Sequence, residues 1–177
     1  MRSKQASGLP LHWAVGDIFV CATQRAGSTS MMASLKKYRE VHAQGIYRQP
    51  EKRSVMWLRN PWDRLCSNLV IWKPQDYEEW ITNVVFFEHN AHWLPQTEIH
   101  SWNGVPIWNE LYLFDDLATT WPIVFPSIPL EHKRSSPNRI KKLELIDSLK
   151  PSTVDNIEAF YKEDLELYDN YSRLSFP

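Results

Sequence analysis

The stretch Asp17-Ile18-Phe19-Val20-Cys21-Ala22-Thr23-Gln24-Arg25-Ala26-Gly27-Ser28-Thr29-Ser30 decides the fold. It begins with an apolar run of strand length and then turns through small residues. The residues that follow, 31 to 38, place apolar side chains at helical spacing. The pattern therefore predicts a strand, a tight loop and a helix in that order.

The loop of this unit predicts an anion-binding site. Backbone N–H groups at the start of a helix lack partners, and the positive end of the helix dipole favours a negative charge there. Gly27 allows a ligand to approach the backbone, and the hydroxyls of Ser28, Thr29 and Ser30 add short donors. Arg25 supplies a permanent positive charge. The expected ligand is a phosphate or sulfate ester, although this segment alone also fits a plain helix cap.

Two familiar anion loops fit this segment poorly. A Walker-type loop requires a glycine five residues before Gly27 and a lysine directly after it, and the sequence has neither. A phosphatase loop with a cysteine nucleophile would place its arginine six residues after the cysteine, whereas Arg25 follows Cys21 by four. The loop therefore belongs to another class.

The length and the charge of the chain limit the number of domains and the kinds of partner that we expect. Its 177 residues suit a single domain, 1–177, in which residues 1–16 are expected to form an arm that leads to the first strand. With 20 basic and 21 acidic residues, no overall field points to nucleic acid or to an anionic membrane. Any positive site must therefore be local.

The number of cysteines and the hydropathy of the sequence predict the cellular compartment of the protein. Two cysteines are too few for a disulfide scaffold, and both stand among apolar neighbours, so a reducing environment is expected. We find no signal-peptide pattern and no apolar run of membrane-spanning length. The expected location is cytoplasmic, with no membrane partner.

A second polar constellation follows the strand expected at residues 54–58. The strand ends at Arg59, and Pro61 suits the first turn of a helix that runs to residue 72. On that helix Ser67, Arg64 and Asn68 share the polar face. Since ligands bind at the carboxyl ends of strands in open α/β sheets, Arg59 and Ser67 are candidates for the same site as the first loop.

The remaining segments complete an α/β pattern. We expect a possible short strand at 41–47, helices at 75–87 and from 152 onward, and a buried strand at 111–114. Residues 131–136 could form a mobile loop over an anion or a solvated connector. His89 and His92 lack a third ligand at a convincing spacing, so no metal site is predicted. Strands that alternate with helices favour a mainly parallel sheet.

Taken together, the two constellations resemble the sulfotransferases that use 3′-phosphoadenosine 5′-phosphosulfate (PAPS). The family motif P-K-[ST]-[GA]-[ST]-T-S corresponds to residues 24–30, Gln24-Arg25-Ala26-Gly27-Ser28-Thr29-Ser30. Its second motif, an arginine, then Asp or Asn, then Pro, with a serine eight residues after the arginine, is matched by Arg59-Asn60-Pro61 and Ser67. The segments 92–96 and 160–168 are similar to the carbohydrate sulfotransferases.

The resemblance implies a fold and a set of roles. The fold would be α/β, a P-loop-like three-layer arrangement in which helices flank a small, mainly parallel central sheet. Arg59 and Ser67 would hold the 3′-phosphate, with Arg64 as a weaker candidate. His42 would be the general base, with Glu40 as its rival. The 5′-phosphosulfate would be bound by Arg25, Ala26, Gly27, Ser28, Thr29 and Ser30, with Arg25 also catalytic.

The expected reaction transfers a sulfuryl group from PAPS to a hydroxyl, most simply on a carbohydrate, without a required metal. Arginine at position 25 departs from the family's lysine, and the interval between the two motifs is short, so the acceptor site could need a second subunit. Two alternatives stay open. One is a divergent P-loop nucleotide kinase or NTPase, and the other is an inactive module that binds a nucleotide or a glycan.

Overall fold

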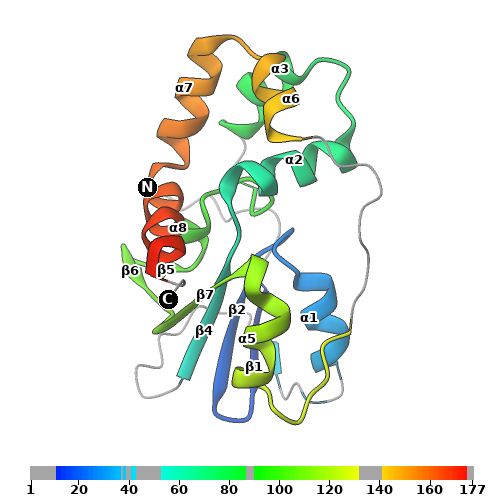
Figure 1. Cartoon of the computed structure of the whole chain (residues 1–177), viewed down its shortest axis with the longest axis vertical. Coiled ribbons are helices and arrows are strands. Elements are labelled where there is room, and N and C mark those ends of the chain that lie inside the picture. Colours follow the sequence, from blue (N-terminus) through cyan, green and yellow to red (C-terminus); the bar gives the residue numbers. More distant parts are fainter. Residues whose placement is uncertain are drawn as a thin grey trace.

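The computed structural model describes residues 11–36, 38, 41–42, 53–86, 90–131 and 141–174. These residues form an α/β fold, and its central sheet has the strand order β3-β1-β2-β4-β7 (Figure 1). Its strands are β1 (Leu11–Val15), β2 (Ile18–Ala22), β3 (Val41–His42), β4 (Arg53–Leu58) and β7 (Glu110–Leu113). A separate hairpin pairs β5 (Ser101–Trp102) with β6 (Val105–Pro106).

The sheet is mixed, which corrects the prediction of a mainly parallel one. β2 pairs in parallel with β4, and β4 with β7, as the alternation of strands and helices requires. β1 runs antiparallel to both β2 and β3. The arm predicted for residues 1–16 therefore ends in a strand, and residues 1–10 lie outside the described part of the chain.

A local signal for this extra strand is present in the sequence. Val15 and Ile18 face each other across the two residues Gly16 and Asp17, which is the loop length of a tight hairpin. Gly16 has φ of +56°, a conformation that glycine adopts without strain. The Gly-Asp pair between apolar residues thus turns the chain back, and the hairpin widens the sheet by one strand beyond β2.

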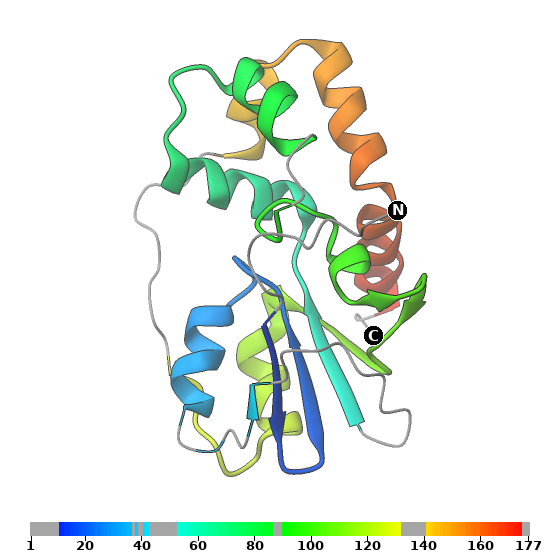
Figure 2. The ribbon, with the colours of Figure 1, turned by 180° about the vertical axis from the view of Figure 1, so that it is seen from behind.

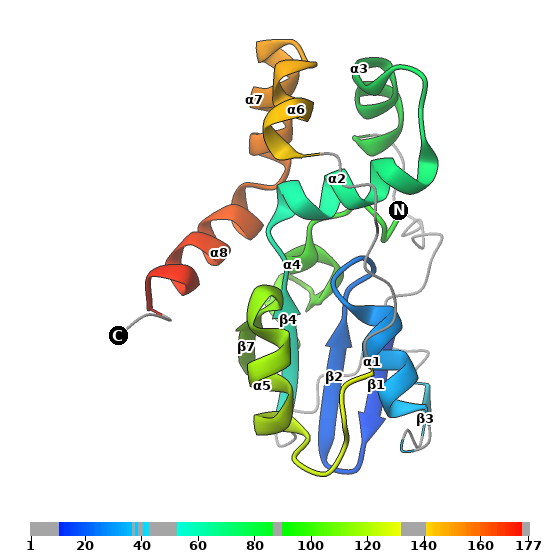
Figure 3. The same ribbon diagram turned by 45° about the vertical axis from the view of Figure 1, so that its right-hand side comes forward.

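Helices pack on both faces of the sheet, and Figure 3 shows two of them, residues 28–35 and 117–124, in front of the strands. The elements are α1 (Ser28–Leu35), α2 (Pro61–Trp72), α3 (Tyr77–Trp80), a π-helical turn η1 (Ile81–Val85), α4 (Gln96–Ile99), a 3₁₀ turn η2 (Phe114–Asp116), α5 (Leu117–Val124), α6 (Lys142–Asp147), α7 (Pro151–Phe160) and α8 (Lys162–Leu174). The predicted helices after residues 30, 61, 75 and 152 are therefore present. Residues 43–47 and 132–136 of the predicted short strand and loop lie outside the described residues.

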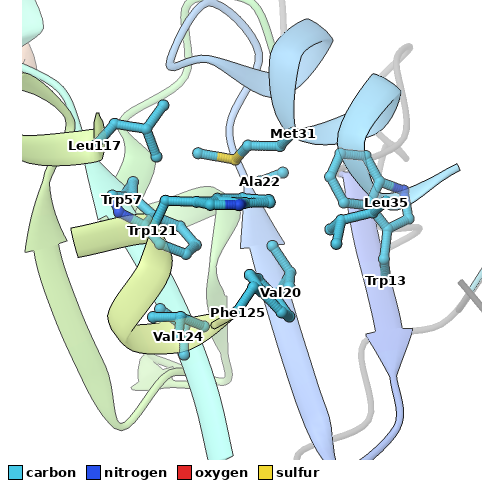
Figure 4. Packing of buried hydrophobic residues seen from close by; sticks show 11 residues of the cluster. Trp13, Val20, Ala22, Met31, Leu35, Trp57, Leu117, Trp121, Val124 and Phe125 are labelled. Atoms are coloured by element: carbon cyan, nitrogen blue, oxygen red, sulfur yellow. The ribbon is translucent and has the colours of Figure 1, made fainter. Parts of the chain in front are cut away.

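The first face of the sheet packs against α1 and α5. Val20 and Ala22 of β2 point to the same side as Trp57 of β4, because strand side chains alternate between faces. Met31 from α1 and Trp121 from α5 close over them (Figure 4). The ring centroids of Trp57 and Trp121 lie 5.7 Å apart. This apolar layer holds the start of α1 firmly against the end of β2.

The opposite face packs against the C-terminal helix. Phe19 and Cys21 of β2 and Met56 and Leu58 of β4 form its inner layer. Partly buried residues of α8, among them Leu167, pack on them. Helices on both faces thus give three layers, while the finer assignment to a P-loop-like fold remains a prediction.

Helices α2, α3, α6 and α7 and the turn η1 form a separate unit beyond the carboxyl end of the sheet (Figure 2). α2 leads into it from β4, and its apolar face, with Trp62, Leu65 and Leu69, packs on α6, α7 and η1. No helix among the described residues is long and apolar enough to span a bilayer.

Replacing Gly27 with alanine is expected to destabilise the fold by about 2–4 kcal/mol. Gly27 has φ of +75°, and a Cβ there would lie 2.6 Å from Phe114 Cε2 and 3.1 Å from Leu117 Cδ2. The backbone strain of alanine at a positive φ and the steric overlap of its Cβ with Phe114 therefore both lower the free energy of unfolding. Thermal unfolding should show a midpoint lower by about 5–15 °C for a chain of this size.

Gly16→Ala is the matched control for this substitution. Gly16 also has a positive φ, but a Cβ there would meet no atom within 4 Å. Its cost should be the backbone strain alone, about 1 kcal/mol. Equal losses in the two variants would contradict the close packing of Gly27 on Phe114.

Candidate anion-binding site

The two constellations predicted to bind one ligand lie together in the structure. β2 and β4 are neighbouring parallel strands, so the loops that follow them share one edge of the sheet. Arg25 Nη2 donates to Ser67 Oγ at 3.0 Å and to the Ser67 carbonyl at 3.1 Å. Arg59 Nη1 donates to the Arg25 carbonyl. Arg25, Arg59 and Ser67 therefore form one cluster with two guanidinium groups.

The loop between β2 and α1 is a tight turn. Arg25 and Gly27 both have positive φ, 67° and 75°, and the Ala26 N–H donates to the Thr23 carbonyl at 3.1 Å. Ala26 is buried in the core, whereas Thr29 is exposed and Ser30 is half-buried. α1 begins at Ser28 with no acidic residue in its first turn. Its positive end is therefore not neutralised by its own first turn, as an anion site requires.

Arg59 is held at the end of β4 by its backbone and its side chain. Gln96 Oε1 accepts from the Arg59 N–H at 3.1 Å, and Gln96 Nε2 donates to the Arg59 carbonyl at 2.7 Å. The guanidinium carbon lies 5.2 Å from the centre of the Phe114 ring, within range of a cation–π contact. Asn60 Oδ1 caps α2 by accepting from the Trp62 N–H.

Arg64 has a structural position. Its side chain is 1% exposed and donates to the carbonyls of Gln24 at 3.2 Å, Leu94 at 2.7 Å and Ala91 at 2.7 Å. These bonds tie the anion loop to the segment before α4. Because its guanidinium already binds three backbone carbonyls in the interior, Arg64 has a structural role and is not a ligand of the proposed 3′-phosphate site.

The sequence predicts no role as a base for His92, and the structure makes it a further candidate for this site. Its backbone carbonyl accepts from Asn68 Nδ2 on the polar face of α2. Burial, followed by the positive charges of Arg64 and Arg25, lowers the pKa of His92 below its ordinary value. Its Nδ1 is buried without a hydrogen-bond partner among the described residues. His92 is therefore a half-buried, neutral imidazole that feels the charges of Arg64 and Arg25.

His42, the base predicted from the sequence, lies in a different part of the sheet. β3 pairs with β1, and His42 faces Trp13, whose partner on β2 is Val20. The backbone of His42 is thus separated from β2 by a whole strand. Its side chain, Glu40 and His89 lie outside the described part of the structure.

Aromatic residues extend this region toward the solvent. Trp72, at the end of α2, is 49% exposed, and its ring centroid lies 6.3 Å from that of His92 and 5.3 Å from that of Trp93. Elsewhere, Trp93 is buried, Trp108 is half-buried and Trp102 is 53% exposed on β5. Trp72 is the exposed tryptophan that stands beside His92.

No protein-family model matches this chain, and no curated protein or solved structure matches it either. The function is therefore argued from the two motifs and from the geometry that brings them together.

Proposed function

We propose that this protein is a PAPS-dependent sulfotransferase that acts on a hydroxyl of a carbohydrate. The observation that carries the proposal is the hydrogen bond from Arg25 to Ser67, with Arg59 on the Arg25 carbonyl. It joins residues 42 positions apart in the sequence that match the two family motifs. An ordinary helix cap would not require that the two motifs meet.

The roles follow from the positions of the charges. The N–H groups at the start of α1 and the Arg25 guanidinium would bind the 5′-phosphosulfate. Arg59 and Ser67 would bind the 3′-phosphate, the group that distinguishes PAPS from ATP. The bond between Arg25 and Ser67 links the two ends, so both phosphates of one nucleotide could be bound at once.

The transfer is an in-line displacement at sulfur. The acceptor oxygen forms a bond to sulfur, the bond between sulfur and the phosphate oxygen breaks, and adenosine 3′,5′-bisphosphate leaves. Arg25 and the loop amides stabilise the charge that develops on the leaving oxygen. We propose that His92 takes the proton of the acceptor hydroxyl, because its half-buried imidazole is neutral near pH 7 and lies within range of the Arg25 charge. Trp72 offers an apolar face on which a sugar ring can lie.

Adenosine 3′,5′-bisphosphate is expected to stabilise the protein more than ADP does. At about 100 times its dissociation constant a ligand that binds only the folded state adds about 2.7 kcal/mol, which thermal unfolding detects as a shift of about 5–10 °C. Arg59→Ala should weaken this binding about 10- to 100-fold, since a charged hydrogen bond is lost.

Arg53→Ala is the control for this measurement. Arg53 stands at the other end of the same strand and pairs with Glu110 on the protein surface. Its substitution should leave nucleotide binding unchanged. Equal stabilisation by both nucleotides, or a preference for ATP with Mg²⁺, would contradict the proposal and favour a kinase.

Arg25→Ala is expected to lower sulfate transfer about 100-fold, because one donor to the developing charge is removed. Arg25→Lys should retain more activity, since an ammonium group can also donate to the leaving oxygen. Transfer of labelled sulfate from PAPS to a panel of oligosaccharides measures both. If wild-type protein binds adenosine 3′,5′-bisphosphate but labels no acceptor, the protein is a binding module and the enzyme proposal is wrong.

The identity of the acceptor, the possible homodimer and the cytoplasmic location stay predictions from the sequence. The exposed indole of Trp72 can pack against a sugar ring or against a small aromatic acceptor such as a phenol. A panel of acceptors that includes both classes therefore belongs in the transfer assay.

A further inference from the structure

Three side chains that commonly bind metals meet beneath the anion loop. His12 on β1 and Cys21 on β2 face each other in the antiparallel register, and His100 follows α4. One donor atom from each lies within 4.8 Å of the others. His12 Nε2 and His100 Nδ1 are 3.0 Å apart. All three residues are 2% exposed or less.

Neighbouring groups hold the two imidazole rings in place. Thr23 Oγ1 lies 2.8 Å from His100 Nε2, and the ring of His12 stacks on Phe19 with centroids 5.4 Å apart. When His100 Nε2–H donates to the Thr23 hydroxyl, the lone pair of Nδ1 faces the cluster. A hydrogen bond on the outer ring nitrogen is the usual way in which proteins orient a metal-binding histidine.

All three donors lie in the interior, so a cation that binds here must replace the proton of the Cys21 thiol.

The donor set favours a soft monovalent ion. Two imidazoles and a thiolate suit copper and zinc. Cu⁺ with one thiolate is electrically neutral, whereas Zn²⁺ would leave a net charge in a buried, apolar place. We propose that His12, Cys21 and His100 form a buried Cu⁺ site.

Binding of Cu⁺ requires the three donor atoms to shift relative to one another, and the released proton balances the charge of the cation. Donors at about 2.0–2.3 Å from one cation lie about 3.3–3.7 Å apart, so a pair at the 4.8 Å limit must close by about 1.1–1.5 Å. The Cys21 S–H bond gives its proton to the solvent, and a bond from sulfur to copper forms. The proton that His12 and His100 share moves to His12 Nδ1, and no electron is transferred. This site does not depend on the transferase reaction.

The test is an anaerobic titration of the whole chain with Cu⁺ in competition with a coloured Cu⁺ chelator. Wild-type protein should bind about one equivalent, and Cys21→Ser and His12→Gln should bind at least about 10-fold more weakly. Cys66→Ser is the matched control, because Cys66 is also buried and free but belongs to α2. It should bind copper as the wild type does.

X-ray absorption of the copper-loaded wild type gives a second readout that requires no variant to fold. The nearest shell should contain one sulfur and two nitrogens. A shell without sulfur, copper binding that Cys21→Ser leaves unchanged in a folded variant, or tighter binding of Zn²⁺ than of Cu⁺ would each overturn the proposal.

Discussion

Replacing His92 with glutamine is expected to lower sulfate transfer about 100- to 10,000-fold, the usual contribution of a general base. The affinity for adenosine 3′,5′-bisphosphate should change little, because His92 is assigned to the acceptor and not to the nucleotide. The His92 backbone carbonyl accepts a hydrogen bond from Asn68 Nδ2 on α2, and burial, Arg64 and Arg25 lower the pKa of the ring.

The pH profile of transfer provides a sharper measurement. A base with a pKa below 6.5 is neutral at pH 7, so the wild-type rate should fall only as the pH drops through that lowered pKa. This acid limb should disappear in His92→Gln. His42→Gln is the comparison, since His42 is the base predicted from the sequence. If His42→Gln abolishes transfer and the acid limb while His92→Gln does not, the assignment to His92 is wrong.

Arg64→Ala is expected to destabilise the fold by about 3–5 kcal/mol, the largest stability loss among these substitutions. It would leave the carbonyls of Gln24, Ala91 and Leu94 buried without their donor. The cavity left by the side chain adds to the cost. Urea unfolding of the two proteins, with fluorescence from the buried tryptophans, measures the difference.

Arg53→Ala again provides the control. The pair formed by Arg53 and Glu110 is about one third exposed on both sides, so solvent screens it and its loss should cost less than about 1 kcal/mol. A loss below about 1 kcal/mol for Arg64→Ala would mean that water replaces its three bonds, and the buried role described for it would be wrong.

Local patterns in the sequence were sufficient for most elements. The strand, loop and helix around Gly27 and the strand that ends at Arg59 follow from spacing and from proline and glycine positions. The cap by Asn60 with Pro61 next to it fixed the start of α2. The antiparallel β1 does not follow from the alternation of strands and helices, although the Gly16-Asp17 turn marks it, because a hairpin adds a strand without an intervening helix.

Other features depend on contacts between distant parts of the chain. Arg64 lies on the polar face of α2, and only the packing of residues 91–94 over it reveals that it is buried. His92 and His100 likewise gain their neighbours from α2, β1 and β2, which lie far away in sequence. The pattern of one helix therefore predicts which face is polar, but not which polar side chain another segment will cover.

Helix α2 belongs to two parts of the protein. It contributes Ser67 to the anion-binding cluster, and it contributes Trp62, Leu65 and Leu69 to the core of the outer helical unit. Local unfolding of α6 or α7 would remove the packing on the apolar face of α2. The helix could then shift, and the hydrogen bond between Arg25 and Ser67 would break. Warming should accordingly abolish nucleotide affinity before the strands separate, so that ligand release and loss of the sheet occur at different temperatures.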